Sequence, residues 1–298
     1  MKMRQLLRAT VSFYLQAMMT GKLIIVPTPL GNLGDMTARA LEALEQADVV
    51  CAEDTRVTGK LLAHFGIENR LERCDENVIA AKSPALVSRM LDGEEVAFCS
   101  DAGMPGISDP GCVLVDAARE AGASVDVLPG PSAVTTALVA SGFKYNAFYF
   151  GGFLPRKEAE RASLLESLAN LDAALVFYES PHRVTASAAS IAQAYGTRPV
   201  ALCRELTKLH EEVLRLPADE LAANLAARDA IKGEIALVIA PPDVRAQQAA
   251  SFDDPALRER IAAELAAGTP KSALAKQLAR ELGLPKNKLY DLILSFPE

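Results

Sequence analysis

Short runs of β-branched and other apolar residues alternate with amphipathic stretches through the first half of the chain. Helices are expected where apolar residues recur every three or four positions, at 36–47 and 113–121. Buried strands are expected at 23–26, 49–53, 96–100 and 125–128. Strands that alternate with helices favour a largely parallel sheet between helical layers. The pattern therefore predicts an α/β domain over residues 22–141.

A second α/β domain is expected over residues 142–242, after a Gly- and Phe-rich connection at 141–153. Its strands are expected at 173–179, 199–205 and 234–240, and its helices at 156–170 and 182–194. The alternation then stops at a linker, residues 243–254, and the rest of the chain has only helical spacing.

Residues 255–298 have the pattern of three short helices joined by tight turns. Gly268 and Gly283 stand where helix C-caps are favoured, and Pro270 and Pro285 stand near the starts of the following helices. Three such helices are typical of a small helix-turn-helix module.

Composition and charge limit the class of protein. The 298 residues are 50% hydrophobic and 23% charged, which allows a packed core and argues against intrinsic disorder. The five cysteines form no Cys-x-x-Cys pair, which suits a reducing cytoplasm, and the three histidines have no metal-ligand spacing. No apolar run approaches the roughly 18 residues of a membrane span. We therefore expect a cytoplasmic protein without a metal site.

The first 21 residues and the net charge refine the expectation of a cytoplasmic protein. Residues 1–21 lack the uninterrupted apolar segment of a secretory signal, so they are expected to be an N-terminal extension. The formal net charge is −7, so a nucleic-acid partner would have to be bound by local basic patches.

The strongest local motif is SDAGMPGISDPG at residues 100–111, directly after an expected strand. Glycines and prolines at this density bring backbone close to a ligand, and ligands of open α/β sheets bind at the carboxyl ends of strands. Asp101 is placed to bond a ribose hydroxyl or an amine. Asp109 and Pro110 are expected as the N-cap and first residue of the next helix. An ordinary tight connection explains the composition equally well.

The motif FYESPHR at residues 177–183 also follows an expected strand. Ser180 is expected as a helix N-cap, which places His182 and Arg183 in the first helical turn, near Glu179. A histidine there either handles a proton, contacts phosphate or lies on the surface without a chemical role.

Two more loops follow expected strands. Residues 27–35 match neither a dinucleotide-binding nor a P-loop signature, because Gly31 and Gly34 stand alone among prolines. Residues 203–212 carry a dense run of charges, which is as typical of a solvated face as of a binding loop.

Eight motifs, taken together and in order, resemble the tetrapyrrole-methylase superfamily and, within it, the methyltransferases of small-subunit ribosomal RNA. The motifs are VPTPLGNLGDMT at 26–37, AEDTR at 52–56, SDAGMPGISDPG at 100–111, LPGPSAVTTAL at 128–138, GFLPRK at 152–157, FYESPHR at 177–183, RELTK at 204–208 and KGEI at 232–235. The resemblance covers residues 22–242, and the three helices resemble the C-terminal helix-turn-helix module of that family.

This resemblance implies a two-domain class III α/β methyltransferase that binds S-adenosylmethionine between its domains and forms a homodimer. The implied reaction is 2′-O-methylation of a cytidine in 16S rRNA near the decoding site, with the rRNA in the 30S subunit. The residues implied to hold the cofactor are Pro29, Asp101, Gly103, Ile107, Ser108, Ser132, Ala133, Tyr178, Gly233, Glu234 and Ile235.

Methyl transfer to a hydroxyl is an in-line displacement, so positioning of the two reactants supplies much of the rate. A group must still accept the hydroxyl proton, and the candidates are Glu179, His182 and Lys208. Phosphate contacts are expected from basic residues of the loops, namely Arg56, Lys157, Arg183 and Arg204. The helical module either adds phosphate contacts or braces the dimer.

Two other functions remain open. The same fold could methylate a tetrapyrrole such as a precorrin, although a small macrocycle needs neither the basic loops nor the helical module. A non-catalytic regulator could bind nucleic acid through the helical module, although the two α/β domains and the cleft expected between them would then have no role. Cofactor binding separates the regulator from the two enzymes, and basic-loop variants tested on 30S subunits separate the enzymes from each other.

Overall fold

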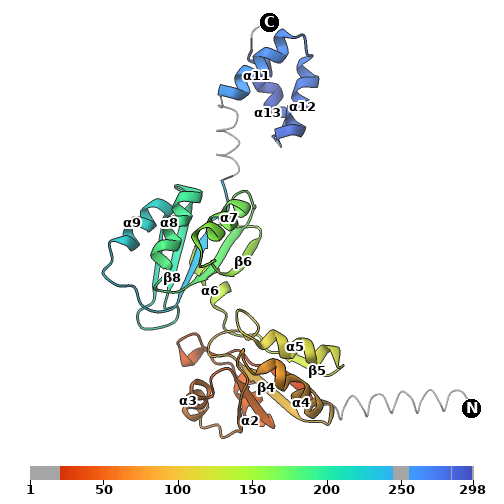
Figure 1. Cartoon of the computed structure of the whole chain (residues 1–298), viewed down its shortest axis with the longest axis vertical. Helices are drawn as coiled ribbons and strands as arrows, with labels where there is room; N and C mark the ends of the chain where they lie inside the picture. Colours follow the sequence, from red (N-terminus) through yellow and green to blue (C-terminus); the bar gives the residue numbers. More distant parts are fainter. Residues whose placement is uncertain (1–20, 244–254, 283, 297–298) are drawn as a thin grey trace, which may run out of the picture.

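The computed structural model describes residues 21–243, 255–282 and 284–296. Residues 1–20 of the expected N-terminal extension and 244–254 of the expected linker therefore lie outside the described residues. The described chain forms two five-stranded sheets, each covered by helices, and a three-helix unit near the C-terminus (Figure 1). The two-domain α/β fold class with a C-terminal helical module is confirmed, whereas the boundaries between the parts stay predictions.

The first sheet has the strand order β3-β2-β4-β1-β5, and all neighbouring strands are parallel, as predicted. Its strands are β1 (Lys22–Ile25), β2 (Val49–Ala52), β3 (Leu71–Arg73), β4 (Glu95–Cys99) and β5 (Ser124–Val127). Its helices are the short η1 (Leu33–Asp35), α2 (Ala38–Gln46), α3 (Thr55–Phe65), α4 (Ile79–Leu91) and α5 (Gly111–Glu120). The central strands are apolar on both faces, because α4 and α5 cover one face and α2 and α3 cover the other.

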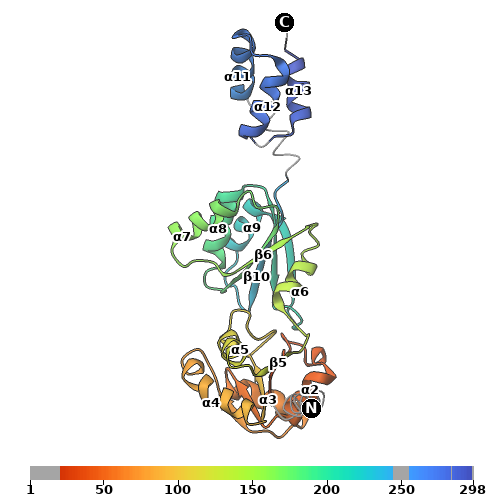
Figure 2. The same cartoon turned by 90° about the vertical axis from the view of Figure 1, so that its right-hand side faces the viewer.

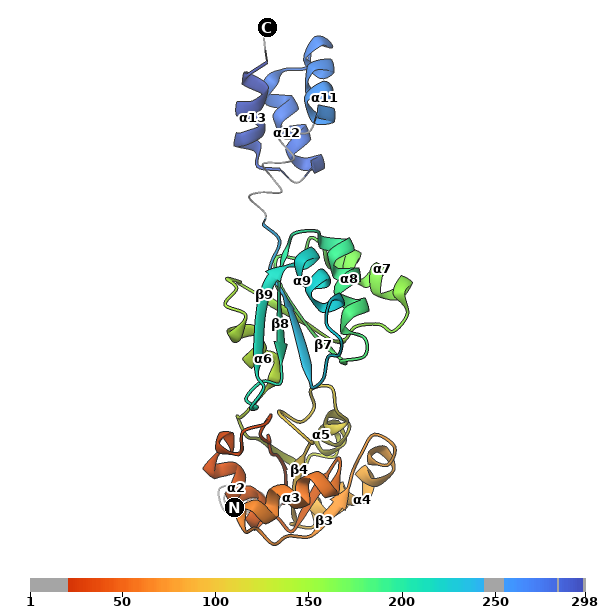
Figure 3. The ribbon, with the colours of Figure 1, turned by 90° about the vertical axis from the view of Figure 1, so that its left-hand side faces the viewer.

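The second sheet has the strand order β6-β7-β10-β8-β9. Its strands are β6 (Phe148–Phe153), β7 (Ala174–Glu179), β8 (Pro199–Arg204), β9 (Glu212–Pro217) and β10 (Ile235–Ile239). Its helices are α6 (Ala133–Ala140), α7 (Glu158–Leu168), α8 (Val184–Tyr195) and α9 (Ala218–Ala226). Figures 2 and 3 show α6 on one face of this sheet and α7, α8 and α9 on the other, in agreement with the two apolar cores.

The second sheet is mainly antiparallel, unlike the first. Only β6 and β7 are parallel, and the pairs β7–β10, β10–β8 and β8–β9 are antiparallel. The physical reason lies in the connection at 205–211, which is too short for a crossover helix and turns the chain back from β8 into β9.

Some elements have no counterpart in the sequence pattern. The stretch expected as a connection, 141–153, contains edge strand β6, and the charged run 203–212 contains a hairpin turn. Helix α6 precedes the predicted domain boundary at 141, yet its residues Val134, Ala137 and Leu138 pack on the second sheet. The elements that were not anticipated are β3, β6, β9, α3, α4, α6 and α9.

The two predicted helix starts are shifted along the chain. Helix α5 has Pro110 at its N-cap, and the Asp109 carboxylate accepts the Gly111 N–H at 2.8 Å from one residue further back. Helix α8 has Arg183, and not Ser180, at its N-cap. Ser180 accepts the Val184 N–H with its backbone carbonyl oxygen at 3.0 Å, so its hydroxyl does not cap the helix. His182 therefore lies in the turn before the helix and not in its first turn.

The C-terminal unit consists of α11 (Pro255–Ala266), α12 (Lys271–Leu282) and α13 (Lys286–Leu294), as the spacing predicts. The three helices share a core of buried apolar side chains: Leu257, Ile261, Leu274, Ala275, Leu278, Leu289 and Ile293. Gly268 has φ 85°, the left-handed conformation expected of a helix C-cap. Within the described part of the chain, every helix is too short or too polar to cross a membrane.

Candidate active site

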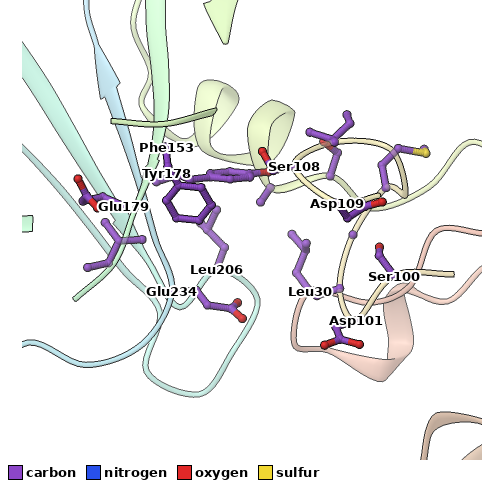
Figure 4. A pocket seen from close by; sticks show the side chains of 18 of the residues that line it. Leu30, Ser100, Asp101, Ser108, Asp109, Phe153, Tyr178, Glu179, Leu206 and Glu234 are labelled. Atoms are coloured by element: carbon purple, nitrogen blue, oxygen red, sulfur yellow. The ribbon is translucent and has the colours of Figure 1, made fainter. Parts of the chain in front are cut away.

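A cavity of about 420 Å³ lies between the two sheets, within the range of small-molecule sites. The first sheet contributes loops that follow the carboxyl ends of β1, β2 and β4, and the second contributes the ends of β6, β7 and β8 and the start of β10. Figure 4 shows the two walls, with Leu30, Ser100 and Asp101 on one side and Phe153 and Tyr178 on the other. The cavity therefore occupies the place where an open α/β sheet binds ligands.

Ten of the eleven residues expected to hold the cofactor line this cavity. They are Asp101, Gly103, Ile107, Ser108, Ser132, Ala133, Tyr178, Gly233, Glu234 and Ile235. Pro29 is the exception: its neighbour Leu30 lines the cavity, whereas Pro29 itself does not. Loops that are far apart in sequence thus meet at one place.

The loops after β1 and β4 are joined by backbone hydrogen bonds. Thr28 and Gly103 exchange two N–H to carbonyl bonds, at 2.9 and 3.0 Å, and the Thr28 hydroxyl donates to the Ser100 carbonyl at 3.1 Å. Gly103 has φ 82°, and a Cβ at this position would lie 3.1 Å from Leu30 Cδ2. Only glycine allows this approach without strain, so the two loops form one fixed wall.

Backbone strain is concentrated beside the cavity. Among the described residues, the non-glycine positions with positive φ are Ser108, Glu205 and Thr207, with φ of 66°, 51° and 65°. Ser108 lines the cavity, and the other two belong to the β8–β9 turn that borders it. Strain of this kind persists where the surrounding structure enforces it, and it clusters at functional sites.

One wall of the cavity is acidic. The Asp101 carboxylate accepts the Asp54 N–H at 3.0 Å, and the Glu53 carboxylate lies 3.5 Å from the Asp101 amide nitrogen. Burial raises the pKa of Glu53, and the negative charge of Asp101 raises it further. Burial also raises the pKa of Asp101. Within the described chain neither carboxylate has a Lys or Arg partner, so this wall favours a cationic ligand group.

The opposite wall offers aromatic surface. The Tyr178 ring has edge-to-face contacts with Phe150 and Phe153, at centroid distances of 5.0 and 5.7 Å. Phe153 is 54% exposed, an unusual fraction for a phenylalanine. Burial raises the pKa of Tyr178 to about 12, so its hydroxyl stays protonated at neutral pH. A flat, apolar ligand group fits this wall.

The three residues proposed as proton acceptors have different surroundings. Glu179 lines the cavity, but its side chain is fully buried in a polar network. Its carboxylate accepts the Ser180 N–H at 2.7 Å and the Ser187 hydroxyl at 2.5 Å, and it pairs with Arg183 at 2.5 Å. The carboxylate is therefore occupied by three donors.

His182 and Lys208 do not line the cavity. His182 is exposed and follows Pro181, which does line it. The Lys208 ammonium donates to Glu205 Oε1 at 2.8 Å and to Glu234 Oε2 at 3.0 Å. Burial lowers the pKa of Lys208, but the hydrogen bonds to Glu205 and Glu234 outweigh it and leave the pKa raised. Lys208 is thus a stable cation and a poor proton acceptor.

The predicted phosphate-binding residues fall into two groups. Arg56 and Lys157 point outward with side-chain exposures of 86% and 80%, although each pairs with a neighbouring carboxylate. Arg183 and Arg204 are mostly buried, because Arg183 binds Glu179 and the Leu154 carbonyl and Arg204 binds Glu212 and the Lys232 carbonyl. These two stabilise the fold beside the cavity.

Several lining residues were not anticipated from the sequence, in particular Leu30, Glu53, Ser100, Phe153 and Leu206. Each one lies at a strand end or in the loop that follows it, and inside one of the eight motifs. The position of a motif at a strand end was therefore the available signal for these residues.

Comparison with known proteins agrees with this geometry. Residues 22–222 match the family model of the tetrapyrrole (corrin/porphyrin) methylases. The ribosomal RNA small subunit methyltransferase I of Micromonospora olivasterospora is 41% identical over 92% of this chain and 87% of its own. The protein of that name from Escherichia coli O157:H7 is 42% identical over 92% of this chain and 95% of its own.

Solved structures show the same fold at low sequence identity. A cobalt precorrin-4 methyltransferase has a TM-score of 0.56 at 18% identity and covers 74% of this chain and 94% of its own. Uroporphyrin-III C-methyltransferase from Thermus thermophilus, in complex with S-adenosyl homocysteine, has a TM-score of 0.51 at 17% identity and covers 73% of this chain and 97% of its own. Because the family model spans more than half of the chain and the curated relatives are about 40% identical over most of it, the chain belongs to the tetrapyrrole methylase family.

Proposed function

We propose that this protein transfers a methyl group from S-adenosylmethionine to the ribose 2′-oxygen of a cytidine in 16S rRNA, near the decoding site of the 30S subunit. The observation that supports this proposal best is the large share of the chain that the curated rRNA methyltransferases match. They match about 92% of the chain, which is long enough to extend into the C-terminal helical unit, whereas the tetrapyrrole enzymes match about 74% and share only the fold.

The residues of the cavity fit S-adenosylmethionine. The cofactor carries a planar adenine, a sulfonium and an amino-acid group with a cationic ammonium. The aromatic wall around Tyr178 suits the adenine, and the acidic wall around Asp101 suits the cationic part. The Ser100 hydroxyl is buried in the wall without a hydrogen-bond partner, so a bound ligand would supply one. When bound, the cofactor supplies an activated methyl group for in-line transfer.

The protein's own contribution is orientation. The hydrogen-bonded loops after β1 and β4 and the strained turn after β8 fix the walls before the reactants arrive. Among the three proton-acceptor candidates, Glu179 is occupied by donors and Lys208 remains a cation. His182, exposed beside the cavity-lining Pro181, is the acceptor that we propose for the 2′-hydroxyl proton.

The substrate would be bound outside the cavity by exposed cations. Arg56 follows β2 and Lys157 precedes α7, so they extend from different sheets. Their phosphate contacts would position the RNA without reading its sequence. A ribose hydroxyl would then enter the cavity from a nucleotide turned away from its neighbours.

The test is methyl transfer from labelled cofactor to 30S subunits that lack 2′-O-methylation, with free 16S rRNA in parallel. A ribose 2′-O-methyl group makes the adjacent phosphodiester bond resistant to alkali, so label in alkali-resistant dinucleotides supports the proposal. Label on a base, or cofactor binding without label in either RNA, would refute it. In the second case a precorrin would be the next acceptor to test, because the fold also occurs in precorrin methyltransferases.

The His182 assignment has its own test. The variant His182→Ala should lose methyl transfer by about a hundredfold and keep its affinity for the cofactor. Unchanged transfer in this variant would exclude the imidazole as the proton acceptor.

A homodimer in the cytoplasm is the assembly that we propose together with this function, and sedimentation equilibrium measures its mass.

A further inference from the structure

Among the described residues, Ser100 is the one cavity-lining residue whose side-chain oxygen is buried and has no hydrogen-bond partner. It is 3% exposed, directly after β4. Its carbonyl oxygen is used, because the Thr28 hydroxyl donates to it at 3.1 Å, but its own hydroxyl is not. Leaving a buried hydroxyl unpaired is unfavourable, so a bound ligand that supplies the partner is favoured.

The surroundings of Ser100 indicate which part of a ligand supplies that partner. Figure 4 shows Ser100, Asp101 and Asp109 together on the first-sheet wall, across the cavity from Phe153 and Tyr178. Adenine is planar and suits the aromatic wall, so the opposite end of the same molecule reaches the Ser100 side.

Charge selects between the two groups at that opposite end, an ammonium and a carboxylate. Glu53, Asp101 and Asp109 all line the cavity on the Ser100 side, and none of them has a Lys or Arg partner within the described chain. A ligand carboxylate would be repelled by these three groups, whereas an ammonium is attracted. An ammonium donates hydrogen bonds and a serine hydroxyl accepts them.

We propose that Ser100 is a cofactor-binding residue whose hydroxyl accepts a hydrogen bond from the α-ammonium group of S-adenosylmethionine. The neighbouring carboxylates supply the charge that attracts this ammonium. The inference concerns the cofactor and not the RNA, so binding titrations without RNA test it separately from the proposed function.

The experiment compares Ser100→Ala with the wild-type protein by calorimetric titration of three ligands. S-adenosylhomocysteine has the complete amino-acid group, its deaminated analogue lacks only the ammonium, and methylthioadenosine lacks the whole group. We expect the variant to bind S-adenosylhomocysteine about tenfold more weakly, because it loses one hydrogen bond to a charged group. Binding of the other two ligands should change less than about twofold, since neither reaches Ser100 with an ammonium.

A second readout needs no ligand. Because the hydroxyl is unpaired in the free protein, the thermal midpoint of Ser100→Ala without ligand should equal or exceed that of the wild type. Ser83→Ala is the matched control: Ser83 is also 3% exposed, but its hydroxyl donates to the Ile79 carbonyl at 2.8 Å. This control should lower the midpoint and leave the three affinities unchanged.

Equal weakening of all three ligands by Ser100→Ala would mean a general distortion of the cavity, and unchanged affinity for S-adenosylhomocysteine would remove Ser100 from the binding site. Weakening of the deaminated analogue as much as of S-adenosylhomocysteine would assign the bond to the carboxylate instead. The variant Ser100→Gly, which also lacks the hydroxyl, should reproduce the ligand order of Ser100→Ala.

Discussion

Gly31 lies directly against the side chain of Lys208, so that a Cβ at Gly31 would come within 2.1 Å of Lys208 Cγ. This contact joins the loop after β1 to the turn after β8, and beside it the Asn32 N–H donates to the Thr207 hydroxyl at 3.2 Å. The far end of Lys208 is held by two carboxylates. The side chain therefore has little freedom to move away, and the contact fixes the two walls of the cavity relative to each other.

The variant Gly31→Ala should disturb both stability and cofactor binding. The added methyl group must displace the Lys208 stem from its place between the loops, because the clash is with Cγ and not with the mobile end of the side chain. Overpacking of this kind costs about 1–3 kcal/mol. Denaturant unfolding should show that loss, and calorimetric titration should show weaker binding of S-adenosylhomocysteine.

Gly59→Ala is the matched control for Gly31→Ala. Gly59 lies inside helix α3, and its added Cβ would meet Leu71 Cδ1 at an ordinary 3.5 Å. Alanine is the better helix former by roughly 1 kcal/mol, so this variant should be neutral or slightly more stable. Equal behaviour of the two variants would contradict the role given to the Gly31–Lys208 contact.

Glu179→Gln should lower stability and activity together. The substitution removes the charge that pairs with Arg183 at 2.5 Å, and it leaves a mostly buried guanidinium without its counter-ion. Breaking a buried ion pair costs about 3 kcal/mol or more. Urea unfolding measures the loss, and methyl transfer is assayed at a temperature where the variant is folded. A fully stable variant without activity would instead make Glu179 the proton acceptor.

The ion-pair network around Glu212 should make stability depend on acid pH. Hydrogen bonds from Arg228, with a further one from Arg204, lower the pKa of Glu212 from 4.5 to about 2. A lowered folded-state pKa stabilises the protein above the unfolded-state value, and the stabilisation is lost as the pH falls from about 4.5 towards 2. The contribution at neutral pH is on the order of 3 kcal/mol.

Glu212→Gln tests this linkage. The free energy of unfolding of the wild type should exceed that of the variant at pH 7, and the two curves should converge as the pH approaches 2. Curves that stay parallel from pH 7 to pH 3 would show that the carboxylate charge does not stabilise the fold.

The double variant Arg56→Glu, Lys157→Glu should lose RNA methylation without losing the cofactor. Both side chains are exposed outside the cavity, so the cofactor affinity should stay within about twofold, whereas repulsion from phosphates should lower transfer to 30S subunits by tenfold or more at low salt. The double variant Arg39→Glu, Arg70→Glu, at two other exposed arginines, controls for the same change in net charge. Equal transfer by the Arg56→Glu, Lys157→Glu variant would place the RNA elsewhere on the surface.

The sequence predicted the elements whose signal is local. Strands such as β4 and β10 are buried on both faces, so they are continuous apolar runs, and the C-terminal helices have strong spacing with Gly268 at a turn. The motifs at strand ends also identified most of the cavity wall, because parallel strands place their carboxyl ends on one edge of the sheet. Family resemblance added the cofactor and the class of reaction.

Edge elements were missed because their local signal is weak. Strand β6 contains two glycines and partly exposed aromatics, and the charged turn between β8 and β9 has no apolar pattern of its own. Both are defined by their neighbours in the sheet, and the reversal at 205–211 is what makes the second sheet mainly antiparallel.

The roles of the charged residues were decided only by tertiary structure. In the sequence Glu179, Lys208 and Arg183 are equally plausible as chemical groups, since spacing does not reveal which charges are paired. In the fold Glu179 and Arg183 neutralise each other, and Lys208 is held between two carboxylates against Gly31. Ser100, an ordinary serine in the sequence, lines the cavity in the fold and has a buried, unpaired hydroxyl. The sequence by itself determined which segments become strands and which loops follow them, because those choices depend on neighbours along the chain. Burial and pairing of charge depend on how strand ends and loops from different parts of the chain come together, as where the Lys208 side chain packs against Gly31, so only the folded chain determines them.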